Sequence, residues 1–120
     1  LSGKMDQDHV FADNDHRNFN CDGQLFNVGE TFAGLPYAKG VELASGIKDI
    51  LPTDAPMAQS SLRWILDHDA VTVVIPGASK VEQASLNAAS SDLKPLSESV
   101  HEELKSFYHS NVEEYIRGSY

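Results

Sequence analysis

The 120-residue chain is poor in several features that would point to a function directly. Its one cysteine, Cys21, cannot form an internal disulfide, which favours a reducing compartment, so we expect a cytoplasmic location. Only 9 Lys and Arg stand against 18 Asp and Glu, and the resulting net charge of −9 argues against nucleic-acid and anionic-membrane partners. No apolar run approaches the ~20 residues of a membrane-spanning helix.

Motifs for metal binding and for common catalytic centres are also missing. The acidic residues near the start of the chain follow neither the calcium-loop nor a zinc-binding spacing, so no metal site is predicted. There is no Walker-type phosphate loop and no Ser–His–Asp order, so no catalytic residue is assigned. The chain opens on Leu1 rather than on an initiating Met, and we therefore expect a piece of a longer protein.

Hydrophobic periodicity divides the chain into segments. Residues 1–34 show neither a helical nor a strand period and read as a long irregular loop. Residues 35–67 carry two amphipathic helices, and residues 71–76 begin with five β-branched side chains, which predict a buried strand. A helix over 80–91 and a last helix over 97–117, with one apolar stripe, complete the expected order.

A lone strand leaves the fold class open between two alternatives, because a buried strand must pair its backbone groups. The chain is either an all-α domain with one extended segment or part of a larger α/β protein. Five consecutive β-branched residues are typical of a strand buried on both faces of a parallel sheet, so the sequence favours the second alternative.

The stretch after that strand offers the clearest candidate for chemistry. A glycine turn is followed by capping-box spacing, which predicts Ser79 as the N-cap of a helix. A helix N-terminus attracts phosphate, Lys80 adds a positive charge, and Gly77 permits close approach of a ligand. Gln83 and Asn87 lie four residues apart on one face and could contact a base. The alternative is an ordinary capped helix with two solvated amides.

These residues resemble the C-terminal part of the aldo-keto reductases. The resemblance rests on Leu62–Leu66, Val71–Ile75, Pro76–Gln83 and Asn87, and extends to Leu1–Lys4 and to Asp15-His16-Arg17-Asn18-Phe19. The bacterial and potassium-channel β-subunit-like branch is the most similar. The family implies an α/β fold, the C-terminal part of a (β/α)8 TIM barrel. Residues 1–34 would then be the loop after strand 7, 35–67 helices, 71–76 strand 8, 80–91 helix 8, and 97–117 a C-terminal helix.

The resemblance also assigns a cofactor-binding role to seven residues. By matching position, the 2′-phosphate of NADPH is held by Gly77, Ser79 and Lys80, the adenine lies near Gln83 and Asn87, the pyrophosphate lies near Lys4, and Arg17 clamps the cofactor. Two departures matter. Leu86 stands where the family often has Glu, and Lys80 replaces a frequent Arg, which keeps the charge and loses the two-pronged geometry.

For the parent protein, the resemblance implies NADP(H)-dependent reduction of aldehydes or ketones to alcohols. Its partners are the cofactor, a small carbonyl substrate and the rest of the barrel. The motifs of the family's catalytic Asp, Tyr, Lys and His are absent here, so this chain alone is expected to be inactive. Two other hypotheses stay open: an NADPH-sensing regulatory subunit, and a small α-rich interaction domain without a nucleotide site.

Overall fold

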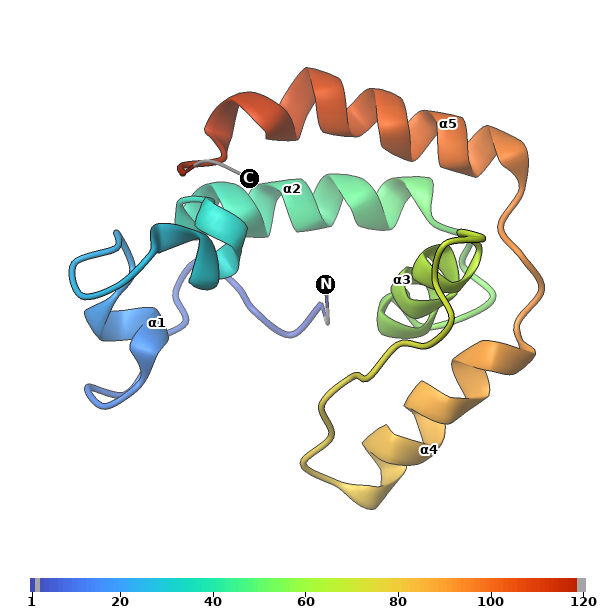
Figure 1. The fold of residues 1–120 in the computed structure, drawn as a ribbon, viewed down its shortest axis with the longest axis horizontal. Coiled ribbons are helices and arrows are strands. Elements are labelled where there is room, and N and C mark those ends of the chain that lie inside the picture. The colour runs from blue at the N-terminus through green and yellow to red at the C-terminus, as the bar shows by residue number, and fades with distance from the viewer. Residues whose placement is uncertain (2, 119–120) are drawn as a thin grey trace.

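The computed structural model describes residues 1 and 3–118, which form helices joined by long connections (Figure 1). No helix in this part of the chain combines the length and apolar character needed to cross a bilayer. The principal helices are α2 (Tyr37–Ile50), α3 (Met57–Leu66), α4 (Val81–Ala89) and α5 (Glu98–Phe107). Shorter elements are α1 (His16–Phe19), η1 (Val28–Glu30), η2 (Phe32–Gly34), η3 (Ser90–Asp92), η4 (Tyr108–Val112) and η5 (Glu113–Tyr115).

The four principal helices form an open arrangement rather than closed layers. Helices α2 and α5 lie side by side, and α3 contacts both α4 and the η3 turn (Figure 1). Among the described residues, the only hydrophobic side chains that are buried are those of Leu43 and Leu51. The chain therefore has a small core, centred on α2 and the residue that follows it.

The predicted strand over residues 71–76 is wrong, and with it the prediction of an α/β fold as the end of a (β/α)8 barrel. The described residues contain no strand, and the fold is all-helical. Val73 and Ile75 are 66% and 89% exposed, so the segment is not buried on both faces. The physical reason is pairing: a β-branched run becomes a strand only beside another extended segment, and no described segment forms a strand beside this one.

The C-terminal region also departs from the single helix predicted over 97–117. The Ser97 side chain accepts a hydrogen bond from the Val100 N–H and caps α5, which begins as expected. The α-helix ends at Phe107 and continues as a wider π turn and a 3₁₀ turn. The amide of Asn111 donates to the Phe107 carbonyl at 3.2 Å, and such side-chain bonds compete with regular helical pairing.

The N-terminal third contains the short elements α1, η1 and η2, and it is organised around one buried amide. Asn20 is fully buried, and its Oδ1 accepts hydrogen bonds from the backbone N–H groups of Leu25 and Phe26 at 2.9 and 3.0 Å. Its Nδ2 donates to the Thr31 hydroxyl at 3.1 Å. Because buried polar groups stabilise only when paired, these three bonds fix the course of residues 20–31.

The close approach of α2 and α5 depends on Gly46. A Cβ placed there would lie 2.8 Å from Cε2 and Cζ of the Phe107 ring, whereas a Cβ at Gly40 would meet its nearest atom at 4.0 Å.

We expect Gly40→Ala to raise the free energy of unfolding by up to about 1 kcal/mol, because alanine favours helix. Gly46→Val should lower it by about 1–3 kcal/mol through overpacking. Urea unfolding of both variants tests this, and equal effects would contradict it.

Candidate functional site

The connection from the 71–76 segment to α4 is an exposed turn held in place by two amides. Gln83 Oε1 accepts hydrogen bonds from the backbone N–H and the hydroxyl of Ser79, at 2.9 and 3.0 Å. Asn87 Nδ2 donates to the Gly77 carbonyl oxygen at 3.2 Å. The two amides that the sequence associates with a base are therefore used to fasten the turn onto α4.

The predicted capping box at the start of α4 is wrong. Lys80, with φ −140° and ψ 150°, occupies the N-cap position, and no side chain caps the first turn. Gln83 draws the Ser79 hydroxyl to its own oxygen instead of leaving it to cap the helix. As a result, the first N–H groups of α4 point out of the helix without a side-chain acceptor, which leaves a partial positive charge there.

Lys80 provides the full positive charge at this turn. It is exposed, and its side chain makes no hydrogen bond or ion pair with any residue in the described part of the chain. Gly77 is exposed, and a Cβ there would have no neighbouring atom within 4 Å. The turn thus presents a cation and open space beside an uncapped helix, which together suit an anion.

The other two predicted contacts are not part of this turn. Arg17 lies on α1, which Figure 1 shows well apart from the beginning of α4. Lys4 is exposed in the N-terminal segment. The structure therefore brings together five of the seven predicted residues, the ones between Gly77 and Asn87, and leaves Lys4 and Arg17 in other segments.

Arg17 is engaged by its own neighbours. Its Nε donates to Asp15 Oδ1 at 2.9 Å, and its guanidinium carbon lies 4.7 Å from the centre of the Phe11 ring. These hydrogen bonds from Arg17 hold the pKa of Asp15 well below its usual range, and the same pair raises the pKa of Arg17. In this arrangement Arg17 forms an ion pair with Asp15 inside the N-terminal segment and does not reach toward a cofactor site at α4.

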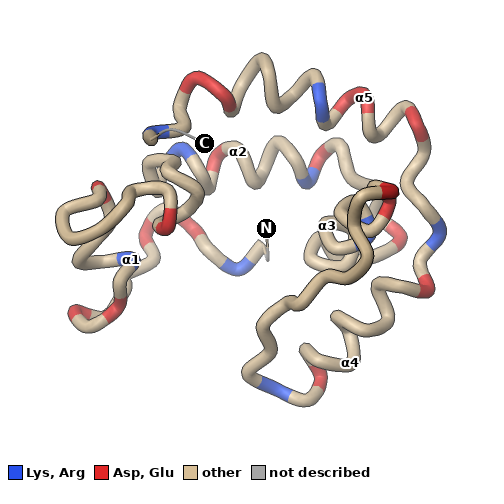
Figure 2. Tube along the Cα trace, in the orientation of Figure 1, with Lys and Arg blue, Asp and Glu red and all other residues tan. Residues whose placement is uncertain are grey.

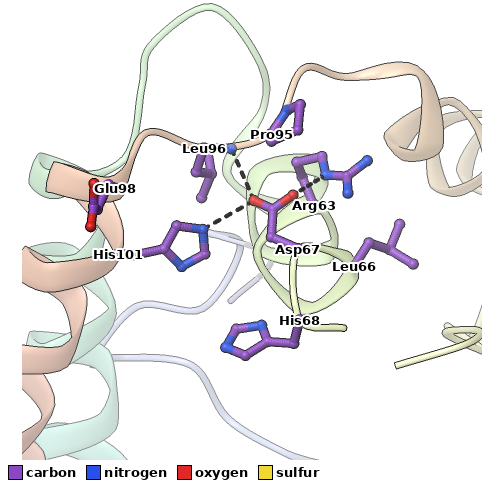
Figure 3. A pocket seen from close by; sticks show the side chains of 8 residues that line it. All are labelled: Arg63, Leu66, Asp67, His68, Pro95, Leu96, Glu98 and His101. Carbon is purple, nitrogen blue, oxygen red and sulfur yellow. Dashed lines mark hydrogen bonds and ion pairs between the residues drawn. The ribbon is translucent and has the colours of Figure 1, made fainter. Parts of the chain in front are cut away.

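A second cluster surrounds Asp67 at the end of α3, in a cavity of about 480 Å³ (Figure 3). The Asp67 side chain is only 5% exposed. Its Oδ1 accepts from Arg63 Nε at 2.7 Å, and its Oδ2 accepts from the Leu96 N–H at 2.9 Å and lies 3.1 Å from His101 Nε2. One carboxylate therefore joins α3, the connection before α5, and α5 itself.

The charge state of Asp67 follows from these contacts. Burial opposes ionisation, but the Leu96 N–H, His101 and Arg63 outweigh it and hold the pKa of Asp67 below its usual value. Arg63 Nη1 also donates to the carbonyl oxygens of Ser91 and Leu93, at distances of 3.4 and 3.5 Å. Because the carboxylate is saturated by partners, the cluster is suited to holding segments together rather than to proton transfer.

Sequence reasoning missed this cluster. One signal was available: Arg63 and Asp67 are four residues apart on a helix, the spacing at which opposite charges meet. His101 and the Leu96 N–H are distant in sequence, and no local pattern announces their approach. Among the described residues, no group of three or more His, Cys, Asp or Glu side chains is arranged to hold a metal ion.

Comparison with known proteins supports one family. The sequence model of the Aldo/keto reductase family matches residues 1–109. The chain therefore belongs to the aldo/keto reductase family, a family of oxidoreductases that generally use NAD(P)H. No curated protein and no solved structure gives a significant match to the chain.

Proposed function

We propose that this chain binds the phosphate-bearing, adenosine end of NADPH for an aldo/keto reductase that reduces aldehydes or ketones to alcohols. The observation that carries the proposal is Lys80, an exposed cation without a protein partner among the described residues, at the uncapped start of α4. A 2′-phosphate would receive charge from Lys80 and hydrogen bonds from the first N–H groups of α4, beside a Ser79 whose hydroxyl donates to Gln83 and helps to hold the turn.

The fit is good for the phosphate and poorer for the base. Gly77 leaves open space beside the turn, and the amides of Gln83 and Asn87 hold that turn in shape. Since both amides already bond to the turn, they contribute to binding by positioning Ser79 and Gly77 rather than by contacting adenine. Bound NADPH supplies the hydride, while the residues of this chain bind and orient its phosphate.

Removal of Lys80 tests the proposal. In calorimetric titration of the purified chain, Lys80→Ala should weaken NADPH binding about tenfold, because a charged hydrogen bond to phosphate contributes about 1.5 kcal/mol or more. NADH, which lacks the 2′-phosphate, should bind both proteins equally. Added salt should weaken NADPH binding to the unmodified chain, since the contact is exposed. The chain alone is expected to bind NADPH without oxidising it in the presence of an aldehyde.

The matched control is Lys105→Ala, which removes the same charge from an exposed position on α5. If both variants weaken NADPH binding equally, the effect is one of net charge and the assignment of the site to Lys80 is wrong. Equal affinity of the unmodified chain for NADPH and NADH would likewise overturn it.

A further inference from the structure

Helix α4, which follows the candidate phosphate turn, gains little from hydrophobic burial. None of its nine residues is buried, and Val81 and Leu86 are 79% and 48% exposed. No side chain caps its first turn. Isolated helices shorter than about 12–15 residues are only marginally stable in water. Polar contacts with the rest of the molecule must therefore supply much of what keeps α4 helical.

The last turn of α4 leaves one carbonyl oxygen to partners other than the helix backbone. In a regular α-helix the Leu86 carbonyl accepts from the N–H of Ser90, four residues later. Here that N–H donates to the carbonyl oxygens of Asn87 and Ala88, because the helix tightens into η3. The Leu86 oxygen accepts instead from the Ser90 hydroxyl at 3.2 Å and from Nε2 of Gln59 on α3 at 2.8 Å. Gln59 thus caps the end of α4 from another helix.

This cap lies in a closed and uncharged part of the molecule. Gln59 and Ser90 are 8% and 0% exposed, so the Leu86 carbonyl depends on these donors rather than on water. Residues 57–62 and 83–91 contain no Asp, Glu, Lys or Arg, and the tube in Figure 2 carries no charge colour along α4 beyond its first turn. The contact between α3 and α4 is therefore a neutral hydrogen bond, which salt does not screen.

We infer that Gln59 is a positioning residue for the phosphate site, an inference that rests on the proposed function. By capping the end of α4, it keeps the helix formed. A helical α4 keeps Gln83 and Asn87 in place, where they fasten the preceding turn. It also keeps the first N–H groups of α4 aligned. Gln59 contacts no ligand itself, and it lowers the cost of ordering the site when phosphate binds.

Amide hydrogen exchange tests the structural step without any cofactor. Gln59→Met keeps the length of the side chain and removes the donor. The N–H groups of α4 and of Ser79 should then exchange about fivefold faster relative to those of α2, because one hydrogen bond no longer opposes opening. The control Ser61→Ala removes a hydrogen bond to the Met57 carbonyl, which lies within α3, and should leave this ratio unchanged. An unchanged ratio in Gln59→Met, or an equal change in both variants, overturns the inference.

Cofactor titration tests the positioning step. Gln59→Met should reduce the preference of the chain for NADPH over NADH about threefold, because only NADPH carries the 2′-phosphate that needs an ordered turn. Ser61→Ala should keep the preference. A role in overall stability alone would lower the affinity for both cofactors together. An unchanged preference in Gln59→Met, in a chain that prefers NADPH, therefore overturns the inference.

A double-mutant cycle locates the effect at Lys80. In a Lys80→Ala background, Gln59→Met should have a much smaller effect on the preference, since both changes act on the same phosphate contact. An equal effect in both backgrounds would mean that Gln59 acts elsewhere and would overturn the inference. A chain with no preference for NADPH, but with faster exchange in Gln59→Met, overturns the proposed function and leaves Gln59 only as the cap of α4.

Discussion

Asp67→Ala should lower the free energy of unfolding by about 3 kcal/mol, because it leaves the partners of a buried carboxylate without their acceptor. The Arg63 side chain, 14% exposed, loses its ion pair, and the Leu96 N–H loses its hydrogen bond. His101 loses its link to α3. A loss of this size is a large fraction of the stability of a domain with so small a core.

The matched control is Asp69→Ala, which removes the same charge two residues away from an exposed position. Surface substitutions of this kind usually change stability by less than about 0.5 kcal/mol. Urea unfolding of the two variants separates the Asp67 network from a general effect of net charge. Similar losses for both variants would mean that the network contributes nothing specific.

The pH dependence of the Asp67→Ala difference follows from the direction of the pKa shift. The folded state holds the pKa of Asp67 below its value in the unfolded chain, which is about 3.9. The stabilisation is therefore complete above that value and is lost as the pH falls through the folded pKa. The gap between the unmodified chain and Asp67→Ala should stay wide near neutral pH and narrow below about pH 4. A gap that is constant down to strongly acidic pH would contradict this.

The helices were predictable because their signals are local. The apolar stripes of residues 35–67 and the cap at Ser97 specify where α2, α3 and α5 lie, and these helices occur there. The segment 71–76 was not predictable in the same way. Its β-branched residues favour an extended conformation. Whether an extended segment becomes a strand depends on a neighbour that pairs with it, and no local pattern shows whether such a neighbour exists.

The sequence predicted where the candidate site lies but not how its side chains are oriented. The glycine turn, Lys80 and the start of α4 lie together as the order of residues requires. The direction of the Gln83 and Asn87 side chains was not implied by their spacing, because a turn carbonyl and a turn N–H compete with any ligand for the same amides. The Asp67 cluster depends on contacts between segments that are distant in sequence. Sequence spacing therefore indicates only the contact between Arg63 and Asp67, and not the one with His101.

Gly34→Ala is expected to have an effect of similar size, about 3 kcal/mol, for a backbone reason. Gly34 has φ +79°, the left-handed region that favours glycine, and it follows two other residues with positive φ, Phe32 and Ala33. A Cβ at Gly34 would lie 2.3 Å from the backbone carbonyl oxygen of Arg117. Since that oxygen belongs to the main chain, no side-chain rotation relieves the contact.

The control for Gly34→Ala is Gly77→Ala, whose φ is not in the left-handed region and whose Cβ meets open space. Unfolding in urea should show a change within about 0.5 kcal/mol for Gly77→Ala and the large loss for Gly34→Ala. Equal effects would mean that loss of glycine flexibility, common to both positions, outweighs the contact at Gly34.

A double-mutant cycle identifies which part of Arg117 is responsible. The Arg117 side chain binds the same region, with Nε donating to the Gly34 carbonyl at 2.8 Å and a terminal nitrogen 2.6 Å from an Asp22 oxygen. If Gly34→Ala acted by displacing these bonds, its cost would disappear in an Arg117→Ala background. We expect the cost to persist, because alanine at position 117 keeps the carbonyl oxygen that the new methyl group meets.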